Sequence, residues 1–193
     1  MDRSAPLSTA RSIAVSAGPR LTQTAFLSGE LVHLRPLHPA DREVLRGILA
    51  QPAVARWWDV GDPDRAVDEW LIEGGDSVGF AIELDGRVIG SIQYAEENDP
   101  GYRHAGIDLF IDTEHQGHGL GPDAIRTLAR YLFEVRGHHR LTIDPAAEND
   151  RAIAAYRRVG FQPVGIMRLY WRDTNGQWRD GLLMDLVVPD LID

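Results

Sequence analysis

Apolar and polar residues alternate in several short runs, and between these runs apolar residues recur every three or four positions. The alternating runs predict strands at residues 31–35, 78–84, 88–94, 107–111 and 141–144. The helical repeat predicts helices at residues 41–49, 53–58, 64–72, 125–133 and 149–159. Asp85-Gly86 is a strong hairpin signal, and residues 161–170 and 178–188 predict a last hairpin across residues 173–176. This order predicts an α/β protein with one central sheet.

The first 28 residues differ from the rest of the chain, because they are rich in Ser, Thr, Ala and Arg. Their longest aliphatic run is Ile13-Ala14-Val15, which is too short for the apolar part of a signal peptide. We therefore expect a poorly ordered extension at residues 1–28 and a single domain at residues 29–193, a length that suits one domain.

Composition narrows the class of protein. No apolar run reaches about 18 residues, so no membrane-spanning helix is expected. The chain has no cysteine, which excludes disulfides and thiol nucleophiles and fits a cytoplasmic location. The formal net charge of −9 argues against a nucleic-acid partner, which would favour a basic face. The acidity permits a cationic substrate, although it is also explained by solubility alone.

Residues 116–121 read Gln-Gly-His-Gly-Leu-Gly and lie between a predicted strand and a predicted helix. The backbone N–H groups at such a helix N-terminus attract anions, and glycines let the backbone come close to a phosphate. No Gly-Lys-Ser/Thr follows, so this is not a P-loop, and the glycine spacing does not fit a dinucleotide fingerprint. The segment predicts a pyrophosphate cradle, although a plain helix entry has the same signature.

A second motif follows the next strand, with Asn149, Ala152, Tyr156 and Gly160-Phe161 at fixed spacing. The small side chain of Ala152 would let a ligand lie against this helix. Tyr156 would direct its hydroxyl out of an apolar environment, although a lone tyrosine is more often part of the core.

Together the two motifs resemble the GNAT superfamily of N-acetyltransferases, whose Gln/Arg-x-x-Gly-x-Gly/Ala pattern is matched by Gln116, Gly119 and Gly121. The resemblance extends over residues 30–188. It implies a mixed, mostly antiparallel sheet flanked by helices, with the fourth and fifth strands splayed apart. It also implies acetyl-CoA as co-substrate, with no metal and no covalent enzyme intermediate.

The resemblance further implies where the co-substrate binds. The pyrophosphate would lie on the backbone of residues 116–121, that is, Gln116, Gly117, His118, Gly119, Leu120 and Gly121. The pantetheine would pair with the backbone near Ile111 and run past Ala152, with Asn149 bonded to it and Tyr156 facing the thiolate. Many relatives carry Arg or Lys within the turn, where this chain has His118. The phosphate charge is thus left to Arg126, Arg151 or Arg157, among which the sequence does not choose.

A closer resemblance is to the aminoglycoside 6′-N-acetyltransferases. It rests on four places in the sequence: 55–58 (Ala-Arg-Trp-Trp), 106–108 (Gly-Ile-Asp), 144–145 (Asp-Pro) and 149–153 (Asn-Asp-Arg-Ala-Ile). In that subfamily the residue at Asp108 is the general base, the one at Asp144 holds the cationic substrate, and the one at Trp58 lies near the sugar rings. Siderophore-type acyltransferases share some of these features.

Amine acetylation requires a base for the ammonium and an acid for the leaving thiolate. By alternation Asp108 faces away from Ile107 and Ile111, and Phe110 is the apolar exception on its face. Asp108 would remove the proton or only anchor the ammonium, with Asp112 and Glu114 as alternatives. Tyr156 would return a proton to the thiolate, and the amide near Ile111 would polarise the thioester.

The predicted substrate site combines aromatic and acidic residues: Trp57, Trp58, Asp99, Asp108 and Asp144, with Glu96, Glu97, Glu148 and Asp173 as further acids that would surround a polycation. The two tryptophans serve equally well as core residues, and each acid alone is an ordinary turn residue. His115, His118, His138 and His139 lack a metal-binding context.

The leading hypothesis is therefore an acetyltransferase for the 6′-amine of an aminoglycoside, acting as a monomer or homodimer. The alternatives are acetylation of protein N-termini, polyamines or siderophore precursors, or an acetyl-CoA-binding regulatory module without catalysis. An enzyme would lose rate in Asp108→Ala and Tyr156→Phe while still binding acetyl-CoA.

Overall fold

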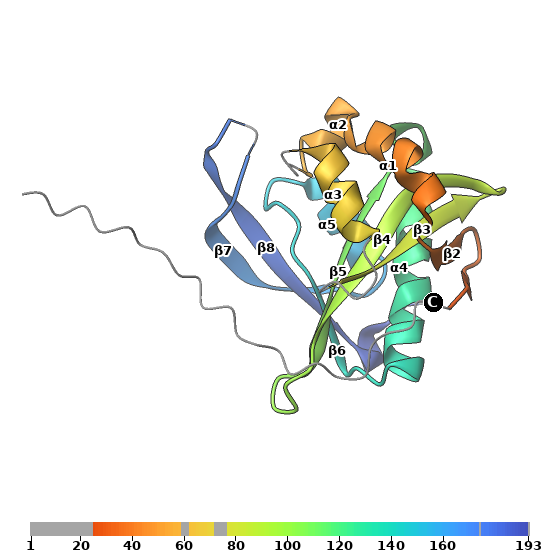
Figure 1. Cartoon of the computed structure of the whole chain (residues 1–193). Helices are drawn as coiled ribbons and strands as arrows, with labels where there is room; N and C mark the ends of the chain where they lie inside the picture. The colour runs from red at the N-terminus through yellow and green to blue at the C-terminus, as the bar shows by residue number, and fades with distance from the viewer. Residues whose placement is uncertain (1–24, 59–61, 72–76, 174, 193) are drawn as a thin grey trace, which may run out of the picture.

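A computed structural model describes residues 25–58, 62–71, 77–173 and 175–192 (Figure 1). Its strands form one sheet in the order β1-β2-β3-β4-β5-β6-β8-β7, in which all neighbours are antiparallel except β5 and β6. The strands are β1 (Leu27–Ser28), β2 (His33–Pro36), β3 (Ser77–Leu84), β4 (Arg87–Glu97), β5 (His104–Ile111), β6 (Arg140–Ile143), β7 (Gln162–Arg172) and β8 (Trp178–Val187). The predicted α/β fold with one mixed, mostly antiparallel sheet is confirmed.

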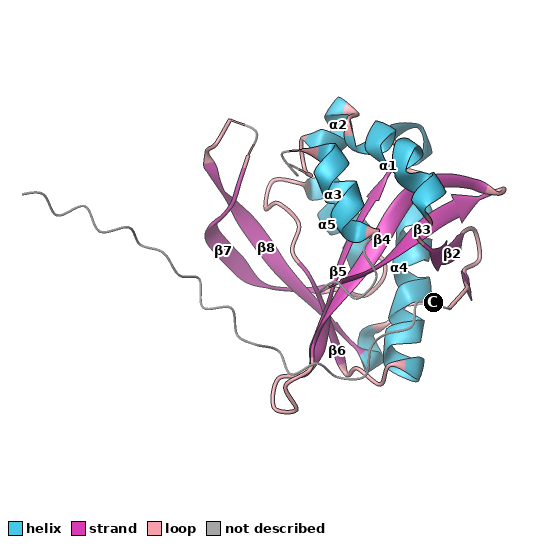
Figure 2. Cartoon of the chain, viewed as in Figure 1, coloured by secondary structure: helices cyan, strands magenta, loops and turns pink. Residues whose placement is uncertain are grey.

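Helices cover both faces of the sheet (Figure 2). They are α1 (Arg42–Leu49), α2 (Pro52–Ala55), α3 (Pro63–Trp70), α4 (Leu120–Arg130) and α5 (Asp150–Arg157), and a π-helical turn at Tyr131–Val135 extends α4. The larger core packs α4 and α5 against one face of the sheet, and a smaller core packs α1 to α3 against the other. No helix in the described segments is long and apolar enough to cross a membrane.

Strands β5 and β6 are the neighbours that separate. Their parallel pairing is limited to Ala105 with Leu141 and Gly106 with Thr142. Beyond these pairs β5 continues to Ile111 without β6 beside it, while β8 and β7 run away from it (Figure 1). The predicted splay of the fourth and fifth strands of the core sheet is thus present, and it opens one edge of β5.

The alternation predicted for β5 is also observed. Ile107 and Ile111 lie in the α4-side core, and Asp108 faces the opposite way, where solvent reaches it. Phe110, the apolar exception on the Asp108 face, packs edge-on against Trp58 and lies next to Trp70 in the smaller core. Phe110 is therefore apolar because helices α1 to α3 cover that end of the Asp108 face of β5.

Several predicted boundaries are corrected. Strand β4 continues to Glu97, beyond the predicted end at residue 94, so Glu96 and Glu97 are strand residues and not turn residues. Residues 27–28 form β1, which pairs with β2 although it falls within the predicted extension. Residues 1–24 of that extension, residue 72 of the third predicted helix and residue 174 of the last predicted turn lie outside the described residues.

The segment before β2 is held to α4 by one buried carboxylate. The two oxygens of Asp123 accept hydrogen bonds from the backbone N–H groups of Glu30, Leu31 and Val32 at 2.8 to 3.2 Å. Because Asp123 lies in the first turn of α4, this contact joins the edge of the sheet to the helix that follows the glycine turn.

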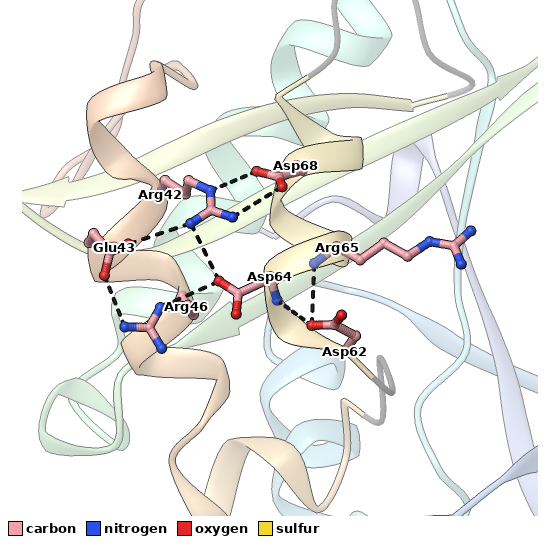
Figure 3. A network of polar contacts seen from close by, with 7 residues as sticks. All are labelled: Arg42, Glu43, Arg46, Asp62, Asp64, Arg65 and Asp68. Atoms are coloured by element: carbon pink, nitrogen blue, oxygen red, sulfur yellow. Dashed lines mark hydrogen bonds and ion pairs between the residues drawn. The ribbon is translucent and has the colours of Figure 1, made fainter.

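Helices α1 and α3 are joined by an ion-pair network at the surface (Figure 3). Arg42 contacts both Asp64 and Asp68 on α3, and Arg46 contacts Glu43 and Asp64. Each exposed pair contributes little alone, about 0.2–1 kcal/mol. Their shared partners fix the spacing of the two helices above the smaller core.

Candidate active site

A cavity of about 320 Å³ lies at the open edge of β5. Its wall is formed by the end of β5, the glycine turn before α4, one face of α5 and helix α2. The lining residues include Ala53, Trp57, Trp58, Leu109, Ile111, Gln116, Gly117, Gly119, Gly121, Asn149, Arg151, Ala152, Tyr156 and Arg158. The two motifs recognised in the sequence therefore meet at one cavity.

The glycine turn has the backbone conformation that only glycine adopts easily. Gly117 has a φ of 86° and Gly119 a φ of 82°, and Gly119 is the N-cap of α4. A Cβ on Gly121 would point toward Ile111 at 3.5 Å without a clash. The turn thus presents backbone N–H groups at a helix N-terminus beside the cavity, as an anion site requires.

Most of the predicted co-substrate residues reach this cavity, and two do not. Ile111, Gln116, Gly117, Gly119, Gly121, Asn149, Ala152 and Tyr156 line it. His118 is exposed and Leu120 is buried in the core, and neither contributes to the lining. For His118 and Leu120, only their backbone remains a candidate for phosphate binding.

The open edge of β5 presents backbone groups to the splay. Asp112 N donates to Ile89 O at 2.8 Å, so alternation along the antiparallel ladder turns the peptide groups of Leu109 and Ile111 toward the splay. Trp58 Nε1 donates a hydrogen bond to the carbonyl oxygen of Leu109 at 3.1 Å, and Gln116 Nε2 donates one to the carbonyl oxygen of Ile111 at 2.6 Å. The Ile111 N–H remains directed at the cavity.

Gln116 connects two walls of the cavity. While its amide nitrogen donates to Ile111 O, its Oε1 accepts from the guanidinium of Arg151 on α5. Arg151 and Arg158 line the cavity, whereas Arg126 and Arg157 are not among its lining residues. Of the three arginines left open by the sequence, Arg151 is the one beside the glycine turn. Asn149 lines the same wall and caps α5, with Oδ1 accepting from Ala152 N at 3.2 Å.

Two carboxylates lie near each other at the splay. Burial, followed by the charge of Asp144, raises the pKa of Asp108 to about 6. Solvent reaches the Asp108 side chain, yet the protein around it is dense enough for desolvation to be the largest cause of the shift. Burial also raises the pKa of Asp144, against a hydrogen bond that favours its ionised form. Neither residue has a cation among the described groups that set its pKa.

Two tyrosines face this carboxylate pair. Burial and then the charges of Asp108 and Asp144 raise the pKa of Tyr156, so its hydroxyl stays protonated near neutral pH. Tyr170, on β7, donates its hydroxyl to Asp144 Oδ2, and burial followed by this bond raises its pKa. Tyr170 was missed by sequence reasoning, because nothing in the pattern of the last hairpin distinguishes it from other strand residues.

The other predicted substrate residues have local partners. Trp58 packs edge-on against Trp70 and Phe110, which makes it a core residue that also borders the cavity. Trp57 lines the cavity under Arg56, whose guanidinium carbon lies 4.5 Å from the indole centroid. Asp99 accepts from Gly101 N within the β4–β5 turn and does not line the cavity.

Three of the remaining acids are bonded elsewhere. Asp112 is held by Gln51 and His115, and Asp173 by Arg179 and its own turn. Glu96 is buried against Arg136 and His138. Asp108 and Asp144 differ from these acids, because both have a raised pKa and no cation among the causes of the shift. Like Asp99, they are not among the lining residues of the cavity. Among the described residues no cluster of His, Asp and Glu could hold a metal ion.

Comparison with known proteins gives one family. The model of the acetyltransferase (GNAT) domain matches residues 32–162. Spermidine N(1)-acetyltransferase from Escherichia coli (strain K12) is 30% identical over 164 residues, which cover 81% of this chain and 86% of that protein. Aminoglycoside N(6′)-acetyltransferase type 1 from Klebsiella pneumoniae is 35% identical over 92 residues, covering 47% and 45%. Mycobacterium smegmatis RimJ in complex with CoA-disulfide superposes with a TM-score of 0.76 at 23% identity, covering 88% of both chains.

Proposed function

This chain belongs to the acetyltransferase (GNAT) domain family, and we propose that it acetylates a primary amine of a polycationic small molecule, in the first place the 6′-amine of an aminoglycoside. As a family member it is an N-acetyltransferase that uses acetyl-CoA. The observation that carries the choice of acceptor is the carboxylate pair Asp108 and Asp144, which lies at the splay without a cationic partner.

The charge of this pair supports a cationic acceptor. Two nearby carboxylates that lack a cation repel each other, and this repulsion contributes to the raised pKa of Asp108. An ammonium bound between them would relieve the repulsion and supply the missing counter-charge. An acceptor with a single positive charge can neutralise only one of the two carboxylates, so the site favours acceptors that carry additional positive charge.

Acetyl-CoA supplies an activated thioester, and the residues of the cavity fit its parts. The glycine turn and Arg151 offer N–H donors and a positive charge for phosphates, and the small Ala152 leaves room beside α5. The Ile111 N–H is oriented to donate a hydrogen bond to the thioester oxygen, on which negative charge develops, as in other oxyanion sites.

The proton transfers follow from the two pKa shifts. Asp108, with a pKa of about 6, is mostly ionised at pH 7 and is poised to take a proton from the ammonium, directly or through water. Tyr156 keeps its proton until the thiolate forms and then donates it. The two groups therefore act as base and acid in one turnover.

A polyamine is the second candidate acceptor. The near full-length similarity to a spermidine acetyltransferase favours it, whereas the similarity to the aminoglycoside enzyme extends over about half of each chain. The hydrogen bond of Asp99 within its own turn and the packing of Trp58 against Trp70 give these two residues local structural roles, which weakens two features of the aminoglycoside reading. The four sequence matches at residues 55–58, 106–108, 144–145 and 149–153 support the aminoglycoside.

The test is release of free CoA thiol with a panel of acceptors: kanamycin, spermidine, an N-terminal peptide with a blocked lysine, and a monoamine that carries a single positive charge. The proposal predicts turnover of kanamycin or spermidine with kcat/KM at least about tenfold above the monoamine. Turnover of kanamycin alone supports the 6′-amine, which mass spectrometry of the product would locate. Turnover of the peptide alone would overturn the proposal.

A further inference from the structure

Strand β7 is interrupted where it passes the carboxylate pair. Met167 is opposite Gly181 and Trp171 is opposite Arg179, so residues 168–170 together face the single residue Asp180 on β8. A bulge of this kind bends the strand and re-aims its side chains. Here the last bulged residue is Tyr170, whose hydroxyl reaches Asp144.

The bulge includes an unfavourable backbone conformation. Leu169 has a φ of 52°, which is uncommon for a residue with a side chain. Its N–H donates to Asp180 Oδ1 at 2.8 Å, which anchors this conformation to β8. An outlier that is held by a specific side-chain bond and lies beside an active site is a candidate functional feature.

A glycine on β8 provides the space for Tyr170. A Cβ added at Gly181 would lie 2.8 Å from Tyr170 Cδ1 and 3.2 Å from Met167 Cε. The tyrosine ring therefore lies directly over the backbone of Gly181. Any larger residue at this position would push the ring away from Asp144.

The backbone after β6 is joined to the same part of β8. Leu182 N donates to Pro145 O at 2.8 Å, and Ala147 N donates to Asp180 O at 2.9 Å. The main chain after Asp144 is thus fixed by β8, while its carboxylate is held by the bulge on β7. Two strands that are distant from Asp144 in sequence therefore position it.

We propose that Tyr170 is a positioning residue of the acceptor site, which the bulge at residues 168–170 places on Asp144 so that the second carboxylate oxygen faces the incoming ammonium. This inference rests on the proposed cationic acceptor. It assigns different tasks to the two acids. Asp144, bonded to Tyr170, binds the ammonium as a fixed anion, and Asp108, which has no such phenol, is left to accept the proton.

Loss of the Tyr170 hydroxyl would change the pKa of Asp144 in a definite direction. The bond from Tyr170 favours the ionised form of Asp144, although burial outweighs it and leaves the pKa raised. Removing the phenol therefore raises the pKa of Asp144 further. Because the ionised pair binds the ammonium, the acid limb of the kcat/KM profile moves to higher pH.

The experiment compares Tyr170→Phe and Gly181→Ala with wild type, and uses Tyr102→Phe as a matched control because Tyr102 is exposed in the β4–β5 turn. Carboxyl NMR titration measures the pKa of Asp144 without any acceptor, and kinetics give kcat/KM for spermidine or kanamycin. In Tyr170→Phe we expect the acid limb to rise by about one pH unit, kcat/KM for the amine at pH 7 to fall about tenfold, and KM for acetyl-CoA to stay unchanged. Gly181→Ala keeps the hydroxyl but displaces the ring, so it shifts the limb in the same direction.

The inference is overturned if the pKa of Asp144 and kcat/KM for the amine in Tyr170→Phe equal those of wild type and of Tyr102→Phe. It is also overturned if KM for acetyl-CoA rises in parallel with that for the amine, because a general disturbance of the fold would do this. If no cationic amine is turned over by wild type while the Asp144 pKa still rises in Tyr170→Phe, the proposed function fails and the placement of Asp144 by Tyr170 stands.

Discussion

Glu96 on β4 and Asp108 on β5 are acids on adjacent strands, and the protein treats them in opposite ways. The Glu96 carboxylate accepts two hydrogen bonds of 3.0 Å from Arg136 and one of 2.8 Å from His138. Burial raises the pKa of Glu96, but these bonds outweigh it and hold the pKa below its usual value. Asp108 has no cation among the described groups around it, and its pKa rises to about 6.

The difference follows from the sheet. Glu96 is opposite Ala105, where β5 is still paired with β6, and the chain after α4 supplies Arg136 and His138 to close that end. Asp108 lies beyond the last β5–β6 pair, where the strands have separated. A carboxylate without a counter-charge costs stability, even where a neutral group such as Gln93 bonds to it, and such sites are often retained because they serve binding or catalysis. Glu96 therefore stabilises the fold, whereas Asp108 is the acid proposed for the reaction.

The largest expected effect is on the reaction at Asp108. Asp108→Asn should lower kcat by about 10² to 10⁴-fold, the usual contribution of a general base, without changing the affinity for acetyl-CoA. Steady-state kinetics and calorimetric titration of acetyl-CoA measure the two quantities. The matched control is Asp99→Asn, which removes an acid from the β4–β5 turn and should retain wild-type kcat. Equal losses in both variants would remove the distinction between the two acids.

The next effect is on stability at Glu96. Glu96→Gln leaves the Arg136 charge without its partner, so we expect the free energy of unfolding to fall by about 2–3 kcal/mol, since breaking a buried pair is strongly destabilising. Thermal melting at pH 7 would show a loss of about 6 °C for a chain of this size. The activity of the folded fraction should be unchanged. A drop in kcat without a drop in melting temperature would place Glu96 in the reaction after all.

A third effect is on the binding of acetyl-CoA by Arg151. Arg151 borders the glycine turn, on the phosphate side of the cavity. Arg151→Ala should raise KM for acetyl-CoA about tenfold, because a charge-assisted bond to phosphate is worth roughly 1.5–3 kcal/mol, and leave KM for the amine unchanged. Arg157→Ala, six residues along the same helix and outside the lining, is the control. Equal KM values in the two variants would exclude Arg151 as the phosphate partner.

The smallest effect is the dependence of stability on pH. A carboxyl whose pKa is raised in the fold lowers the free energy of unfolding when it is ionised. For Asp108 this loss of stability is absent below about pH 4, grows between pH 4 and pH 6, and is complete above pH 6. Asp108→Asn should therefore be more stable than wild type at pH 8, by about 1 kcal/mol after allowing for solvent screening, and no more stable at pH 4. Glu96→Gln should show the opposite trend, because the pKa of Glu96 is lowered. Chemical denaturation at pH 4 and pH 8 measures the free energy of unfolding of both variants. If the two variants changed in the same direction between these pH values, the contrast between Glu96 and Asp108 would be wrong.

Local patterns in the sequence predicted most of the fold. Periodicity identified the strands and helices in the correct order, because each buries a regular apolar face, and the glycine turn was identified because positive φ restricts the choice of residue. The short strand β1 and the π-helical turn at Tyr131–Val135 were missed, since neither has a periodic signature of its own.

The candidate site was predicted only where it is local in sequence. The glycine turn, Asn149 and Tyr156 form contiguous motifs, and they meet at the cavity. Tyr170 contributes through a bulge on a distant strand, which no local pattern encodes. Glu96 was predicted among the substrate acids because its partners, Arg136 and His138, approach it only after α4 has folded back along the sheet.

The most direct test of the account is the pH dependence of kcat/KM for a polycationic amine, measured by CoA release for wild type and Asp144→Asn. The account predicts an acid limb near pH 6 in wild type, because Asp108 must be ionised, and a limb at lower pH in Asp144→Asn, because the neighbouring charge that helps to raise the pKa is gone. A profile without an acid limb between pH 5 and 7, or a limb that Asp144→Asn leaves in place, would contradict the assignment of this carboxylate pair to the acceptor site.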